Sequence, residues 1–221
     1  MSVEFRSATP GDAATAVPLI YSSGPAAFDY VFTVPGRATA LDFLQRAFVD
    51  GAGEFGFRNH VVAVEDHDVV AVGAAWTGAA TLAFTVAAAR QILGTYGLIA
   101  GVGVVYRGLR VESVVQPPPK NRLYLAHLGV RPESRSRGIG VSLIRHLLDA
   151  GSGRGVDVAT LDVAATNPGA QALYERLGFV VIRERESRLA NAQATVANHR
   201  SMELKLAGGS RRMLTARHTS R

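Results

Sequence analysis

A strand-like run that feeds a helix-like run through a basic, glycine-bearing turn constrains the fold of this chain most strongly. Leu123 to Val130 is largely apolar and is followed at once by Arg131-Pro132, whereas Ile139 to Ala150 has apolar residues at helical spacing. The turn between them ends in Arg135-Ser136-Arg137-Gly138-Ile139-Gly140. This order predicts a strand, a tight turn and a helix in direct succession.

The turn is expected to bind an anion. The first turn of a helix leaves backbone N–H groups unpaired and carries the positive end of the helix dipole. Gly138 and Gly140 lack the Cβ atoms that would keep a phosphate away from the backbone, and Arg135 and Arg137 add positive charge. A pyrophosphate is the expected ligand, because the lysine of a P-loop is missing and Leu143 replaces the third glycine of a dinucleotide fingerprint.

Composition excludes several classes of site. The 221 residues are 48% hydrophobic, which is ample for a buried core. The chain has no cysteine, so it has no disulfide framework, no thiol nucleophile and no cysteine zinc site, and its six histidines show no paired ligand spacing. We therefore expect no metal. We also expect a reducing, cytoplasmic location, because the first residues lack the basic and apolar regions of a secretory signal.

The net charge of +6 does not predict a nucleic-acid partner. Four arginines and no acid lie in the tail from Ala207 to Arg221, and without it the body carries 20 basic and 18 acidic residues. We expect residues 207–221 to be a solvated, disordered extension. The body, residues 1–206, is expected to form one domain.

An uncharged run from Val69 to Ala89 is long enough to cross a membrane. The polar turn Glu65-Asp66-His67-Asp68 precedes it, however, and lies between two valine-rich runs. We therefore expect a hairpin of Asn59 to Glu65 and Val69 to Trp76, and no membrane span. The apolar region that follows is predicted to be helical in two pieces.

A second informative stretch runs from Asn167 to Phe179. Asn167 fits an N-cap, Pro168 the first helical position, and Gly178 the end of a short helix. On that helix Tyr174 is expected to face a groove beside the preceding strand. Near the N-terminus, Thr9-Pro10 predicts the start of another helix, which Pro18 should kink or end early.

Together the two stretches resemble the GNAT superfamily of N-acetyltransferases. In that superfamily an Arg-x-x-Gly-x-Gly motif is followed by a helix, a strand and an Asn…Leu-Tyr-Glu-x-Leu-Gly-Phe segment, and Arg135 and Tyr174 stand in that order here. The resemblance implies an α/β (α+β) fold: a mixed, mostly antiparallel sheet flanked by helices, with a splayed central strand pair. Residues 78–121 are then a mostly helical, apolar insertion, which could roof the acceptor pocket or form a homodimer contact.

The resemblance also implies acetyl-CoA as co-substrate and assigns residues to it. The backbone of one strand would pair with the pantetheine arm, the basic turn would hold the pyrophosphate, and a helix cap would add a further contact. These residues are Leu128, Gly129 and Val130, then Arg135, Ser136, Arg137, Gly138, Ile139 and Gly140, and finally Asn167.

For the chemistry, the resemblance implies direct attack of a primary amine on the acetyl group, with a small molecule or a peptide as the acceptor. Tyr174 resembles the general acid that protonates the departing thiolate. The strand lacks the glutamate of many family members, so His127 is the candidate base, and Glu112 in residues 78–121 is a spare candidate. Strand alternation does not decide whether His127 faces the cofactor or the core.

Two further interpretations stay open. Phe28, Asp29 and Tyr30 fall where the family's first helices overhang the acceptor, but a packed loop explains them equally well. The missing strand glutamate is also compatible with a non-catalytic acyl-CoA-binding or regulatory module.

Overall fold

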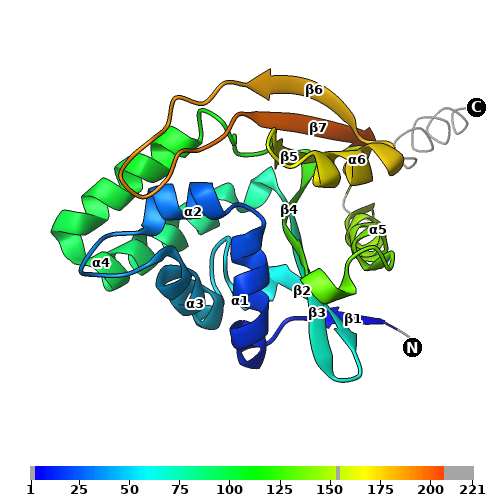
Figure 1. The fold of residues 1–221 in the computed structure, drawn as a ribbon, viewed down its shortest axis with the longest axis horizontal. Helices are drawn as coiled ribbons and strands as arrows, with labels where there is room; N and C mark the ends of the chain where they lie inside the picture. The colour runs from blue at the N-terminus through cyan, green and yellow to red at the C-terminus, as the bar shows by residue number, and fades with distance from the viewer. Residues whose placement is uncertain (1–2, 153–154, 207–221) are drawn as a thin grey trace, which may run out of the picture.

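The computed structural model describes residues 3–152 and 155–206 as one seven-stranded sheet flanked by helices, with the strand order β1-β2-β3-β4-β5-β7-β6 (Figure 1). The predicted disordered tail, residues 207–221, lies outside the described residues. The strands are β1 (Glu4–Ser7), β2 (His60–Glu65), β3 (Asp68–Thr77), β4 (Arg122–Val130), β5 (Val158–Ala164), β6 (Val180–Arg185) and β7 (His199–Lys205). The helices are α1 (Ala13–Ser22), α2 (Pro25–Phe32), α3 (Ala40–Asp50), α4 (Thr81–Val111), α5 (Ile139–Ser152) and α6 (Pro168–Arg176), with short 3-10 turns η1 (Pro10–Asp12), η2 (Phe57–Asn59), η3 (Gly78–Ala80) and η4 (Pro132–Ser134).

The central strand pair splays apart, as expected. β4 and β5 are the sheet's parallel neighbours, and they pair only from Arg122 to Tyr124 on β4 before they diverge. The side chain of Asp162 on β5 accepts hydrogen bonds from the hydroxyl groups of Tyr124 and Ser201. These bonds tie β4, β5 and β7 together close to the point of separation.

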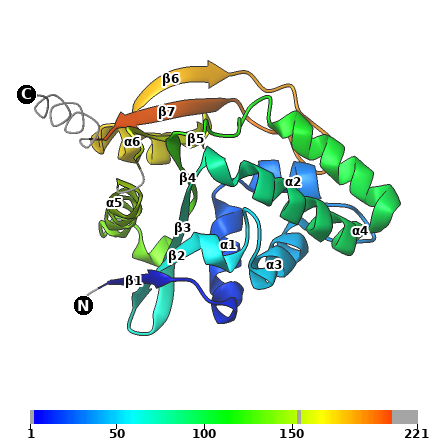
Figure 2. The same cartoon turned by 180° about the vertical axis from the view of Figure 1, so that it is seen from behind.

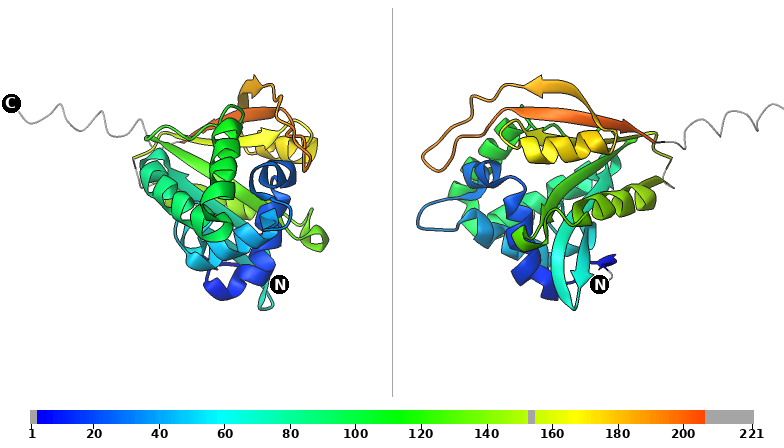
Figure 3. Two further views of the ribbon diagram at one scale, coloured as in Figure 1. Left: turned by 90° about the vertical axis from the view of Figure 1, so that its left-hand side faces the viewer. Right: turned by 45° about the vertical axis from the view of Figure 1, so that its right-hand side comes forward.

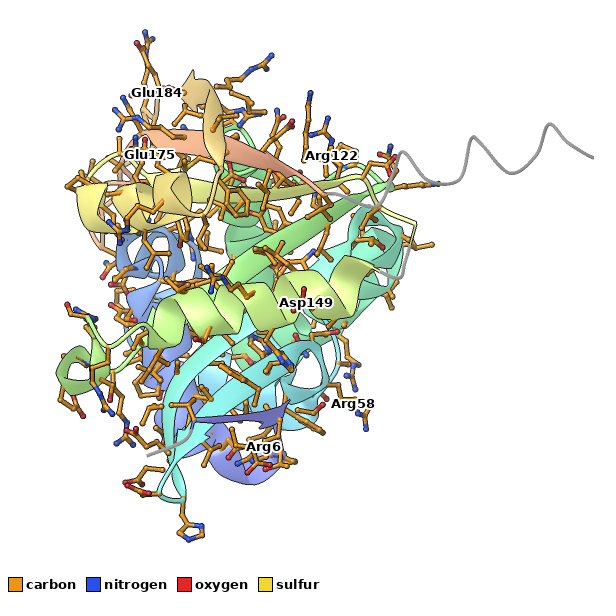
Figure 4. The ribbon with its side chains drawn as sticks, turned by 90° about the vertical axis from the view of Figure 1, so that its right-hand side faces the viewer. Arg6, Arg58, Arg122, Asp149, Glu175 and Glu184 are labelled. Atoms are coloured by element: carbon orange, nitrogen blue, oxygen red, sulfur yellow. The ribbon has the colours of Figure 1, made fainter. Side chains whose placement is uncertain are left out.

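Helices cover both faces of the sheet. Helices α1 to α4 lie on one side and α5 on the other, which the view from behind also shows (Figures 1 and 2). On α5, Leu143, Ile144 and Leu147 pack against the strands, and Leu173 of α6 joins the same core. Figure 4 shows α5 lying across the sheet, with Asp149 labelled on it.

Local sequence signals set most helix ends. Thr39 caps α3, since its Oγ1 accepts from the backbone N–H of Asp42, and Gly51 ends the helix with φ at 80°. Pro18 does not end the helix early, one of the two effects expected of it, because α1 continues past it to Ser22. Pro18 and Ala14, whose carbonyl loses its helical partner, both lie on the exposed side of α1, where water can replace the missing bond.

Helix α4 supplies most of the predicted insertion and is bent, as expected. At Gly97 the backbone leaves the helical region (φ 70°, ψ 179°), and the two arms run in different directions (Figure 3). By length and composition alone, Gly78–Val111 could cross a membrane. The bend divides it, however, into arms that are each shorter than the ~20 residues a spanning helix needs. One side of α4 packs on α2 and α3, and the other is exposed.

Candidate active site

One cavity of about 1170 Å³ joins the elements that carry the predicted site residues. Its walls come from the diverging strands β4 and β5, from the turn before α5, from α6 and from α4. The volume exceeds the ~300–1,000 Å³ usual for one small ligand. The cavity therefore has room for two reactants side by side.

The turn before α5 forms one end of the cavity. Ser136 and Gly138 adopt left-handed backbone conformations, with φ at 61° and 82°. A Cβ atom on Gly138 would meet nothing within 4 Å, so the backbone there faces open space. Ile139 and Gly140, which open α5, line the same end, and the N–H groups of a first helical turn have no partner within the helix. The geometry of this end, called the cradle below, is suited to an anion.

The two arginines of the turn are placed differently. Arg135 lines the cavity, and its Nε donates to the carbonyl of Val130 at 3.2 Å. Arg137 does not line it, because its guanidinium forms two hydrogen bonds with the carboxylate of Glu65, at 2.6 and 2.9 Å. That contact lowers the pKa of Glu65. Arg137 thus anchors the turn to β2 and does not present its charge to the cavity, contrary to the expectation from the sequence.

A β-bulge decides which face carries His127. His127 and Leu128 together face one residue of β3, Gly73, and His127 has a φ of 55°. Leu128 therefore packs in the α5 core with Leu125, although the two are three positions apart. Strict alternation would have placed His127 in the α5 core, on the same face as Leu125. The bulge instead turns His127 to the cavity, where its ring stacks on Phe55 with the ring centroids 5.1 Å apart.

His127 is the centre of a buried polar chain. Its Nδ1 lies 3.0 Å from Nε2 of His60, and Nδ1 of His60 lies 2.9 Å from the carbonyl oxygen of Gly56. On the other side, Nε2 of His127 lies 3.6 Å from Oε1 of Glu54, which is 42% exposed. Burial, followed by the neighbouring His127, lowers the pKa of His60 to about 3, so His60 is neutral at pH 7.

These hydrogen bonds determine which ring nitrogen of each histidine carries the hydrogen. A carbonyl oxygen only accepts, so Nδ1 of His60 carries the hydrogen and its Nε2 is an acceptor. Nδ1 of His127 must then donate to that nitrogen. Neutral His127 is left with its lone pair on Nε2, the atom that faces Glu54.

Tyr174 lines the cavity from α6. Only 9% of the residue is exposed, and its ring packs edge-on against Phe179 at 6.2 Å. Burial raises its pKa to about 12, so the phenol keeps its proton at neutral pH. Asn167 also lines the cavity while capping α6, since its Oδ1 accepts from the N–H of Ala170 at 3.1 Å.

Of the three residues proposed to overhang the acceptor, only Phe28 lines the cavity. Tyr30 is 2% exposed and belongs to the hydrophobic core. The carboxylate of Asp29 accepts hydrogen bonds from the hydroxyl groups of Tyr21 and Thr33, at 2.8 and 3.0 Å. Both residues hold α2 in place and are not presented to a ligand, because α2 turns only one face to the cavity.

Sequence reasoning missed His60, Glu54 and Phe55. The last two lie in a glycine-rich loop between α3 and β2, where an acid beside an aromatic residue was the only signal. His60 is 67 positions from His127, so nothing in the sequence connects them. Across residues 3–152 and 155–206, no three His, Cys, Asp or Glu side chains form a group that could hold a metal ion.

Comparison with known proteins identifies the family. Residues 45–179 match the family model described as acetyltransferase (GNAT) family. The chain belongs to the GNAT family. The match covers more than half of the chain, including the cradle, His127 and Tyr174.

Similar proteins agree with this membership. A [ribosomal protein bS18]-alanine N-acetyltransferase of Salmonella typhimurium is 46% identical over 55 residues, which cover 25% of this chain and 37% of the relative. An N-alpha-acetyltransferase RimI of Mycobacterium tuberculosis is 42% identical over 97 residues, covering 42% of this chain and 57% of that protein. The match thus spans 37% of the length of the first of these relatives and 57% of the second.

The fold of this GNAT protein matches solved structures over nearly its whole length. An N-acetyltransferase from Staphylococcus aureus superposes with a TM-score of 0.64, covering 91% of this chain and all of the other, at 16% identity. At that identity the likeness concerns the fold alone.

Proposed function

We propose that this GNAT protein transfers an acetyl group from acetyl-CoA to a primary amine. The observation that carries the proposal is that the cradle, the basic nitrogen of His127 and the protonated phenol of Tyr174 all face one cavity. A phosphate-rich donor, a base and an acid are what direct acyl transfer from a thioester needs.

The cradle fits the pyrophosphate of CoA. Open space in front of Gly138, the free N–H groups at the start of α5 and the charge of Arg135 together suit a phosphate. Leu128, Gly129 and Val130 line the adjoining wall on the strand that has left β5, so this edge of β4 has no neighbouring strand and can face the pantetheine arm. Asn167 lies at the edge of the same wall.

His127 is suited to activate the amine. A lysine-like ammonium has a pKa of ~10.4 and must lose a proton before it can attack. Nε2 of His127 can accept that proton, and the carboxylate of Glu54 then stabilises the imidazolium as its counter-ion. His60 acts through His127 as a positioning residue, because it holds the tautomer that leaves Nε2 free.

Tyr174 is suited to complete the transfer. The amine nitrogen forms a bond to the acetyl carbon, the carbon–sulfur bond breaks, and the thiolate receives the phenolic proton of Tyr174. The nitrogen loses its extra proton as the amide forms, and that proton, passed through solvent, restores the phenol. A CoA thiol titrates near ~8.5 whereas the pKa of Tyr174 is about 12, so this proton transfer is uphill. The acid role of Tyr174 therefore rests on the position of its phenol in the cavity and not on its acidity.

Transfer of labelled acetyl groups to a panel of amines tests the function. In Tyr174→Phe we expect kcat to fall about 10²-fold or more while CoA affinity is retained, because general-acid catalysis contributes that much. Tyr106→Phe is the matched control, since Tyr106 is 61% exposed and outside the cavity. Equal turnover in both variants would remove the acid role. Tight CoA binding without transfer to any amine would favour the non-catalytic module.

We also propose that the protein is a homodimer that forms through the outer face of α4, and that it is cytoplasmic. Leu98, Ile99 and Val102 are 63–90% exposed on that face. A second copy would offer the same apolar surface. Of the nearby cations, Arg90 pairs with Asp50, and the guanidinium of Arg107 is turned to the carbonyl of Val31.

A further inference from the structure

The cavity has two halves of different chemistry. The half at the cradle is basic and polar, with Arg135, Ser136 and Asn167 in its wall. The other half lies between β3 and α4 and is apolar. Its wall includes Phe28, Phe55, Trp76, Phe84, Val105 and Leu109.

The apolar half begins at His127. The rings of Phe55, Trp76 and Phe28 lie 5.1, 5.7 and 6.2 Å from the His127 ring, centroid to centroid. From there Phe84 of α4 continues the wall, edge-on to Trp76 at 5.4 Å. An acceptor whose nitrogen reaches His127 therefore has its remaining atoms against aromatic and aliphatic side chains.

The charges in this half are acidic. Arg90 and Arg107 of α4 are absent from the cavity wall and are tied to Asp50 and to the carbonyl of Val31. Glu54 and Glu112 do line the cavity, the first beside His127 and the second at the end of α4. The wall thus offers a carboxylate for an ammonium group beside His127, at Glu54, and a second carboxylate, Glu112, at the end of α4.

We propose that the acceptor is a small primary amine with an apolar body, aliphatic or aromatic, which α4 covers. This inference rests on the proposed function and names its substrate class. A peptide N-terminus would bring backbone amide groups against the aromatic and aliphatic side chains of this wall, which costs free energy on desolvation.

Binding can be measured without turnover, because Trp76 is the only tryptophan of the chain and lines the cavity. With CoA present, Trp76 fluorescence would be titrated with propylamine, pentylamine, heptylamine and 2-phenylethylamine, and with spermidine and an alanine-led hexapeptide. We expect Kd to fall up to about 4-fold per added methylene, the equivalent of ~0.8 kcal/mol of burial. A Kd independent of chain length, or tighter binding of spermidine or the peptide, would overturn the inference.

Two variants of residues on α4 test whether this helix causes the dependence of Kd on chain length. Phe84→Ala, and Leu109→Gln at the exposed rim, should each flatten the chain-length dependence while CoA affinity is unchanged. Leu82→Ala is the control, because Leu82 is 76% exposed on the same helix and outside the cavity. Equal flattening in Leu82→Ala would count against the inference.

Thiol release from acetyl-CoA with the same amines separates the two proposals. Chain-length-dependent binding with no release would support the apolar acceptor site and remove the acetyltransferase function. Release only with spermidine or the peptide would keep the function and remove the apolar acceptor.

Discussion

At the scale of single residues, the pairing of His60 with His127 is the feature on which the proposed chemistry depends. Neutral His60 donates from Nδ1 to the carbonyl of Gly56, so its Nε2 must accept from Nδ1 of His127. Neutral His127 therefore has one possible tautomer, in which the basic nitrogen is Nε2, on the side of the cavity. Burial also lowers the proton affinity of His60, so the free energy of unfolding should depend on pH through this residue.

Acid should destabilise the fold partly through His60. The unfolded chain binds a proton there below about pH 6.5, whereas the folded chain, with a pKa of about 3, stays neutral. The free energy of unfolding should therefore decrease as the pH falls from about 6.5 to 3, by up to about 1.4 kcal/mol per pH unit from this group. In urea denaturation, the free energy of unfolding of His60→Gln should change less with pH than that of the wild-type protein. The variant His67→Gln, at an exposed position, should show the wild-type dependence on pH. Identical slopes in all three proteins would contradict this account.

The left-handed glycine of the cradle offers a test of anion binding. Gly138→Ala places a methyl group in the open space before the cradle and strains the backbone, so we expect CoA to bind at least about 10-fold more weakly and the fold to lose about 1–2 kcal/mol. Gly155 is the matched control, with φ at 70° and nothing within 4 Å of an added Cβ. Gly155→Ala should lose similar stability in thermal denaturation but keep its CoA affinity in calorimetry. A similar weakening of CoA binding in both would argue against the cradle.

At the scale of elements, the bend in α4 decides how the insertion lies on the molecule. The conformation of Gly97 is one that only glycine adopts readily, and the preceding carbonyl, of Tyr96, accepts a hydrogen bond from Arg37 at 3.1 Å. The bend allows one helix to pack on α2 and α3 and also to line the cavity.

Two glycines of α4 should respond oppositely to alanine. Gly97→Ala should lower the free energy of unfolding by about 1–3 kcal/mol, because the side chain is incompatible with the bend. Gly94→Ala should raise it by about 0.5–1 kcal/mol, because Gly94 is inside the helix and a Cβ there would meet nothing within 4 Å. Chemical denaturation measures both. Stabilisation by Gly97→Ala would show that the bend is not fixed by this residue.

At the scale of the whole molecule, the outer face of α4 exposes several large apolar side chains, among them Leu98, Ile99 and Val102, and exposed apolar patches often mark interaction sites. Both arms of the helix contribute to it, and they lie at one side of the molecule, away from β1 and α5 (Figure 1). Association of two copies is the proposal that follows.

Ile99→Glu should convert the protein from a dimer to a monomer in analytical ultracentrifugation, since it adds a charge where the side chain is 90% exposed. Arg58→Glu, on the short η2 turn and exposed, is the control that should leave the dimer intact. A monomeric wild-type protein over the whole concentration range would remove the dimer proposal.

The sequence by itself determined the local elements and the family. The Leu123–Gly140 run, the Asn167 cap and Tyr174 were recognisable because strand, turn and capping signals depend on neighbouring residues. Only the tertiary structure decided which side chains meet. The bulge at His127 reversed the facing that alternation would give, Glu65 drew Arg137 away from the cavity, and Tyr30 went to the core. These outcomes depend on contacts between residues far apart in the chain, about which local periodicity carries no information.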